Sequence, residues 1–132
     1  MGLDLYAAHS PEAGLTEADL RAFDEAGIEL CGGIYSGGAG SFRGESYDTL
    51  LINVTNANIY KGWIPPEVVH KMWLALNNCD PAKLLAWDQQ NYEVLDQEYR
   101  GPGLEQLTAD IMELRKFFRV CAERGLGLVS KS

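Results

Sequence analysis

The clearest hydrophobic pattern along the chain lies in its last third. From Leu104 to Cys121, apolar residues recur at intervals of three and four positions, which is the spacing of one face of an α-helix. Gly125 suits the left-handed position that ends a helix. The pattern predicts a helix over Leu104–Arg124 as the main element of the core. Basic residues gather towards its end, as the helix dipole favours: Arg115, Lys116, Arg119 and Arg124.

Three earlier helices are predicted from start signals. Thr16 and Asp19 have the spacing of a capping box, in which each residue satisfies a backbone amide of the other, and a helix over residues 17–25 follows. Proline is pre-set for the first helical turn, so Pro66 and Pro81 predict two more helix starts.

Alternation of apolar and polar residues, typical of strands, is confined to short segments. Residues 3–8 predict a first strand, residues 28–35 a second strand interrupted by two glycines, and residues 126–129 a last strand that can pair with the first. Residues 46–55 suit both a strand and a helix, and we favour the helix. We therefore predict one α+β domain over residues 1–132, with about three strands packed against four or five helices.

Composition and net charge indicate which classes of molecule the protein can bind. With 132 residues, 46% of them hydrophobic, the chain has the size and composition of one globular domain. Its net charge of -8 disfavours nucleic-acid polymers and anionic membranes, because both are bound chiefly through Lys and Arg. Basic proteins and small ligands fit this charge better. The net charge does not exclude a local basic spot.

Cysteine spacing and the start of the chain predict a cytoplasmic protein. The three cysteines are far apart and form no CxxC pair, so we expect free thiols, and neither a metal site nor a cofactor is predicted. The first residues lack the basic and apolar regions of a signal peptide, and no apolar run of about 18 residues follows.

The most unusual segment runs from Cys31 to Tyr47 and is rich in glycine. Six of the 14 glycines of the chain lie between Gly32 and Gly44. Successive small residues can turn backbone amides towards an anion, and the guanidinium of Arg43 adds further donors. The segment does not match the known nucleotide-binding motifs, so an ordinary connecting loop is the alternative.

These residues support a first hypothesis, a non-enzymatic protein that binds a small anionic or nucleotide-like ligand. Tyr35, Phe42 and Tyr47 are the candidates for stacking on a planar ligand, next to Ser41 and Arg43. An interaction protein, such as a homodimer, is the competing hypothesis.

That competing hypothesis depends on Trp63 or on an acidic face, because aromatic anchors dominate protein interfaces. A small hydrolase that uses His9 with Asp4 is the hypothesis we favour least, since no nucleophile motif accompanies the histidine. No catalytic residue is therefore predicted.

The opening Met-Gly-Leu-Asp and the segment Ser41-Phe42-Arg43, followed by Tyr47, resemble a loose group of small uncharacterised bacterial and bacteriophage proteins. The resemblance implies a bacterial or phage origin and suggests that Asp4, Ser41, Arg43 and Tyr47 form one constellation. For a phage-type protein, binding a ligand there would serve to sequester a host signal, an anti-defence role.

Overall fold

The computed structural model describes residues 4–28, 40–44, 47–59, 62–86 and 103–131. Within them the chain forms an α+β fold, as predicted, with one antiparallel sheet whose strand order is β2-β1-β4-β3. The strands are β1 (Asp4–Ala8), β2 (Ser41–Arg43), β3 (Trp63–Ile64) and β4 (Gly127–Lys131). The main helices are α1 (Glu17–Ala26), α3 (Asp48–Thr55), α4 (Pro66–Asn78) and α6 (Leu104–Arg124). Residues 81–86 are also helical.

The predicted pairing of the first and last strands is confirmed, but the number of strands is not. The described sheet has four strands instead of about three. Two of these four strands were not predicted, because β2 and β3 contain three and two residues, too few to show an alternating pattern. They form because the longer central strands β1 and β4 offer backbone partners on their outer sides. The strand predicted over residues 28–35 falls almost entirely outside the described residues.

Local sequence signals fix both ends of α1 and the end of α6. The hydroxyl of Thr16 accepts from the backbone amide of Asp19, and the carboxylate of Asp19 accepts from the amide of Thr16, so the capping box of α1 is confirmed. Gly27 and Gly125 end α1 and α6 with φ of 64° and 66°, in the left-handed region where glycine is least strained. The ambiguous segment is a helix, α3, as favoured.

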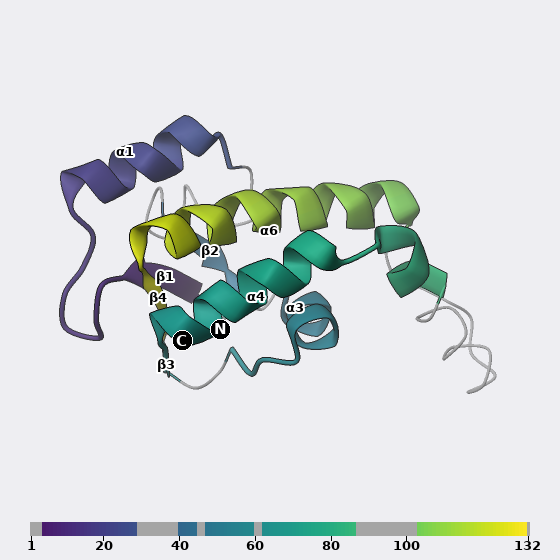
Figure 1. Cartoon of the computed structure of the whole chain (residues 1–132), viewed down its shortest axis with the longest axis horizontal. Coiled ribbons are helices and arrows are strands. Elements are labelled where there is room, and N and C mark those ends of the chain that lie inside the picture. The colour runs from purple at the N-terminus through teal and green to yellow at the C-terminus, as the bar shows by residue number, and fades with distance from the viewer. Residues whose placement is uncertain (1–3, 29–39, 45–46, 60–61, 87–102, 132) are drawn as a thin grey trace.

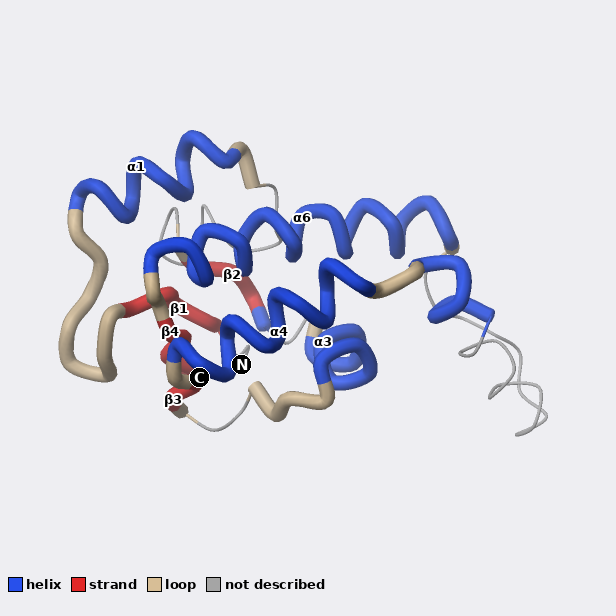
Figure 2. Tube along the Cα trace, viewed as in Figure 1, coloured by secondary structure: helices blue, strands red, loops and turns tan. Residues whose placement is uncertain are grey.

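The helix α6 lies between two others. Figure 1 shows α4 along one side of α6 and α1 along the other, and both pairs are in contact. The strands gather at the end of the molecule where α4 begins and α6 ends (Figure 2). No described helix combines the length and apolar character needed to cross a membrane.

The core lies where these helices meet the sheet. Phe42 of β2 packs edge-on against Phe117 of α6, with ring centroids 4.8 Å apart. Phe23 of α1 packs against the same ring. Other fully buried members come from β1, β4, α3, α4 and α6: Leu5, Leu128, Leu51, Leu76, Ile111, Leu114 and Phe118. Cys121 is also buried as a free thiol, and Cys79 is a free, partly buried thiol, as predicted.

Candidate functional site

The antiparallel pairing of β1 with β2 brings two of the predicted site residues together. Asp4 lies opposite Arg43, and Tyr6 lies opposite Ser41. The Nε atom of Arg43 is 3.8 Å from Oδ1 of Asp4, an ion-pair distance that is too long for a hydrogen bond. The Arg43 side chain is 48% exposed, so this pair is loose.

Two of the predicted stacking residues belong to the core. Phe42 is fully buried, because alternate residues of a strand point to opposite faces and its neighbour Arg43 takes the outer one. Tyr47 is 7% exposed and packs edge-on against Phe42. Ser41 is buried as well, and Tyr35 lies outside the described residues. Of the predicted ligand-binding residues that the structure describes, Arg43 is exposed, Asp4 is partly exposed and the others are buried.

Trp63, the predicted interface residue, lies on β3 at one edge of the sheet and is partly exposed. Its ring covers Gly127 of the neighbouring strand, where an added Cβ would come within 2.5 Å of a ring carbon. Part of the indole is thus used to cover the sheet, which leaves only the rest of it for a partner.

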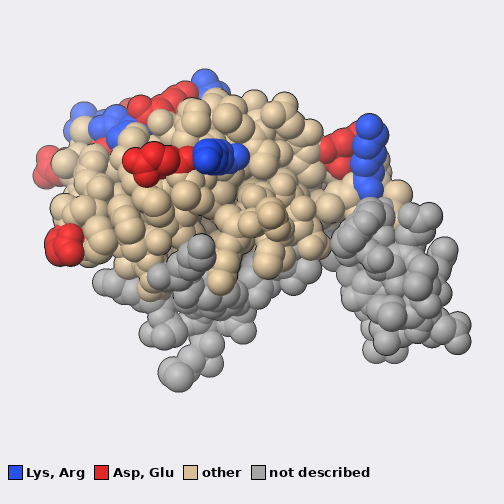
Figure 3. All heavy atoms as spheres, turned by 60° about the horizontal axis from the view of Figure 1, so that its bottom comes forward, with Lys and Arg blue, Asp and Glu red and all other residues tan. Residues whose placement is uncertain are grey.

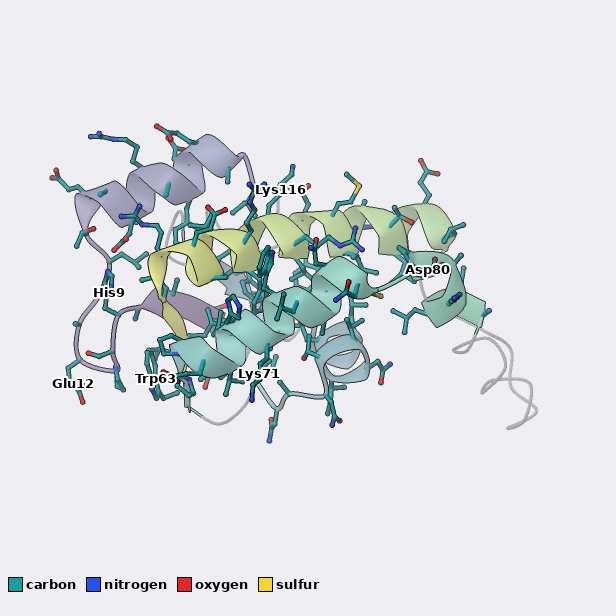
Figure 4. The ribbon with its side chains drawn as sticks, viewed as in Figure 1. His9, Glu12, Trp63, Lys71, Asp80 and Lys116 are labelled. Carbon is teal, nitrogen blue, oxygen red and sulfur yellow. The ribbon has the colours of Figure 1, made fainter. Side chains whose placement is uncertain are left out.

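The partner of His9 is Asp19 and not Asp4, so the pairing that the hydrolase hypothesis required is wrong. Asp4 begins β1 and His9 follows its other end, whereas the helix α1 returns Asp19 to the histidine. Nε2 of His9 is 2.6 Å from Oδ2 of Asp19. Figure 4 shows His9 at the start of the loop that leads from β1 to α1.

Asp19 connects three parts of the fold. Its side chain is 1% exposed, and its carboxylate accepts from Nε of Arg124 in α6 at 2.5 Å, from His9 and from the amide of Thr16. Burial by itself raises the pKa of Asp19, but the hydrogen bonds from Thr16, Arg124 and His9 outweigh it and hold that pKa well below its usual range. These contacts stabilise the fold.

Neither His9 nor His70 is hydrogen-bonded to a Ser, Thr or Cys side chain in the described part of the chain.

A different part of the molecule gathers cationic side chains around a hollow. We call it the α4–α6 hollow; it has a volume of about 340 Å³. Three of its residues are cations and one is a carboxylate, although the whole chain has a net charge of -8. The lining comprises Trp73 and Asn77 of α4, with Arg115, Lys116, Arg119 and Glu123 of α6.

Arg115 is the fixed cation of this hollow. Its Nε donates to the carbonyl oxygen of Leu76 and its Nη2 to that of Cys79, both at 2.7 Å, so it satisfies two carbonyls where α4 ends. The guanidinium is partly buried, and no carboxylate of the described chain lies within ion-pair distance of it. The carbonyls at the end of α4 offset some of its charge, but they are neutral groups.

The other two cations pair with carboxylates of their own helix. Lys116 pairs with Glu113 at 2.9 Å and Arg119 with Glu123 at 2.9 Å, each within one turn of α6. Figure 4 shows Lys116 projecting from α6 on the side of α1. The Arg119–Glu123 pair is exposed on both sides, and exposed i,i+4 helix pairs contribute only about 0.3–0.5 kcal/mol, so an incoming anion can displace that carboxylate.

The sequence contained one signal for this hollow, the basic cluster towards the end of α6, which the helix dipole alone also explains. Four of the 11 Lys and Arg residues of the chain lie within ten positions, 115–124. Their clustering on an acidic chain is the local basic spot that the net charge did not exclude. The contribution of α4 was not predictable, because the crossing of two helices decides which of their residues meet.

A comparison with known protein families, curated proteins and solved structures finds no match. The resemblance to small bacterial and phage proteins therefore stays a prediction. Within the described residues, no three His, Cys, Asp or Glu side chains converge in a way that could hold a metal ion.

Proposed function

We propose that this protein binds a small anionic ligand in the α4–α6 hollow and does not transform it. The observation that carries the proposal is Arg115, a partly buried guanidinium whose described hydrogen-bond partners are both neutral. The ligand class is the one that the sequence favoured, but the proposed site is on α6 instead of the glycine-rich segment.

The physical support is preorganisation. Two hydrogen bonds hold the guanidinium of Arg115 in place before any ligand arrives, so binding costs little side-chain entropy. The remaining N–H groups are a planar set of donors, which suits two oxygens of a carboxylate or phosphate. Lys116 and Arg119 line the same hollow and add positive charge.

The test is a thermal-shift titration with sodium pyrophosphate, against sodium chloride of equal ionic strength. We expect pyrophosphate to raise the melting temperature, because a ligand of the native state stabilises it by mass action. Arg119→Gln is an exposed substitution that should fold normally and weaken binding about threefold, whereas Arg115→Gln should weaken it tenfold or more, roughly the effect of one charged hydrogen bond.

Arg21→Gln serves as the matched control, since Arg21 is an exposed arginine on α1 that does not line the hollow. Its affinity for pyrophosphate should equal that of the wild type. The proposal fails if wild-type protein gains no stability beyond that in sodium chloride at about 10 mM ligand, or if Arg21→Gln and Arg119→Gln weaken binding equally.

Arg43 supports a competing location for the same ligand class. It is half exposed at the edge of the sheet, but Asp4 already faces it and would repel an anion. Including Arg43→Gln in the titration separates the two locations, because only the variant at the true site loses affinity. Sequestration of a host signal is the biological role that we attach to either location.

Protein–protein interaction through Trp63 is the second candidate function. It is favoured by the position of this partly exposed indole on an edge strand. The acidic-face version has less support, because acidic side chains are scattered over the face in Figure 3 and form no single patch there. Light scattering over a range of concentrations tests a homodimer: a dimer that Trp63→Ser converts to a monomer supports it, and a monomeric wild type rejects it.

A further inference from the structure

We infer that the anion bound in the α4–α6 hollow is part of a nucleotide-type ligand whose base stacks on Trp73. This inference rests on the proposed function and names its ligand class more closely. It is carried by α4, the side of the hollow that holds no charged lining residue.

Trp73 provides the flat surface. Its side chain is partly buried against the core and also lines the hollow, so the indole is held in place while part of it meets solvent. Aromatic rings bind bases in this way, because every base has a flat face that can stack. His70, one turn earlier on α4, lies beside the indole with ring centroids 5.7 Å apart and planes tilted by 52°. The exposed histidine therefore extends the aromatic surface beyond the hollow.

The spacing between the aromatic group and the fixed cation suits a nucleotide. Arg115 contacts the carbonyls of Leu76 and Cys79, at the end of α4. Trp73 lies three and six residues before them, a rise of roughly 4.5 and 9 Å along the helix axis. A ligand whose anion meets Arg115 can therefore place a ring on Trp73 if one sugar-sized group separates the two.

Asn77 supplies a polar contact between these two points. It is exposed on α4 and lines the same hollow, and its amide can both donate to and accept from the edge of a base. The volume of about 340 Å³ is near the lower end for ligand pockets, about 300–1,000 Å³, so the hollow fits a mononucleotide better than a larger ligand.

The experiment compares adenosine 5′-monophosphate with ribose 5-phosphate, which has the sugar and phosphate but no base. Affinities are measured by calorimetry on the full chain, wild type and Trp73→Leu. We expect the wild type to bind the nucleotide about tenfold more tightly, within the range of one base stacked on an aromatic ring. Trp73→Leu should abolish this preference and leave the affinity for ribose 5-phosphate unchanged.

Two further variants keep the outcome interpretable. Trp73→Phe retains a ring and packs in the same place, so it should keep most of the preference even if Trp73→Leu folds poorly. Trp63→Leu removes a tryptophan on the sheet, outside the hollow, and should change neither affinity. In the wild type, quenching of tryptophan fluorescence by the nucleotide but not by ribose 5-phosphate gives an independent signal of stacking, which Trp73→Phe should lose.

The inference and the proposed function fail in different ways. If both phosphates bind the wild type equally and Arg115→Gln weakens both, the anion site stands and the inference about the base is wrong. A preference that persists in Trp73→Leu also rejects the inference. If neither compound binds although pyrophosphate stabilises the wild type, the anion site stands and the inference is wrong. If pyrophosphate does not stabilise the wild type either, the proposed function fails and the inference fails with it.

Discussion

The sequence favours the region around Arg43 as an anion-binding site, whereas the structure favours the region around Arg115. Arg43 is half exposed and lies 3.8 Å from the carboxylate of Asp4. Arg115 is partly buried, makes two hydrogen bonds of 2.7 Å to carbonyl oxygens and has no carboxylate partner in the described chain. The unusual sequence around Arg43 thus surrounds a loosely paired charge, whereas a regular helix carries the fixed, unpaired one.

A sequence motif marks a site only when the fold leaves its groups available. The residues next to Arg43 are largely used for packing, since Phe42 is buried against Phe117. Around Arg115, the neighbours Lys116 and Arg119 face solvent in weak pairs. The first region builds the core and the second presents charge to solvent.

The largest effect should come from Phe42→Ala. Phe42 is fully buried in the core. Removing its ring should therefore lower the free energy of unfolding by about 3–5 kcal/mol. Urea denaturation measures this, with Ile52→Ala, which is 50% exposed, as a control that should change little. A loss below about 1 kcal/mol would contradict the assignment of Phe42 to the core, because the β2 region would then be free to act as a binding surface.

A slightly smaller loss, about 3 kcal/mol at neutral pH, is expected for Asp19→Asn. The substitution leaves Arg124 without its buried carboxylate and weakens the bond to His9. Glu123→Gln is the control on the same end of α6, since its pair with Arg119 is exposed. Equal losses in the two variants would contradict the role of Asp19 as a buried connection.

The same substitution changes the pH dependence of stability. Because the pKa of Asp19 is lowered in the folded state, the unfolded chain takes up a proton first as the pH falls. This contribution to stability is therefore complete above the unfolded pKa of about 4 and is lost as the pH falls further towards the folded value. Wild type should lose stability more steeply than Asp19→Asn between about pH 4.5 and 2.5, and parallel curves would refute the assignment.

The smallest effects distinguish the two arginines directly. Arg115→Gln should destabilise the fold by about 2 kcal/mol, because two charge-assisted hydrogen bonds to the end of α4 are lost or weakened. Arg43→Gln should cost less than about 1 kcal/mol, as expected for an exposed ion pair. The comparison of the two regions collapses if Arg43→Gln is the more destabilising of the two in urea.

Much of the fold could be predicted because its signals are local. The capping box of Thr16 and Asp19, the glycine after each of α1 and α6, and the apolar face of α6 each lie within a few residues of one another. Strands β2 and β3 could not be predicted, because two or three residues form a strand only when a longer strand is already beside them.

The candidate sites depend on tertiary contacts more than the helices do. The capping box predicted that Asp19 would bond to Thr16, but its contacts with His9 and Arg124 connect residues 10 and 105 positions apart. No spacing rule relates such residues. The sequence likewise showed a basic end of α6, but not that Arg115 would reach the end of α4.

The α+β class, the capping box of α1, the glycines after α1 and α6 and the net negative charge can all be predicted from the chain without its structure, because neighbouring residues and composition give rise to them. Which charges are neutralised and which remain available depends instead on contacts between distant parts of the chain. These contacts follow from the packing of the helices and the sheet, which buries Phe42, pairs Asp19 and places Arg115 and Trp73 in the lining of one hollow.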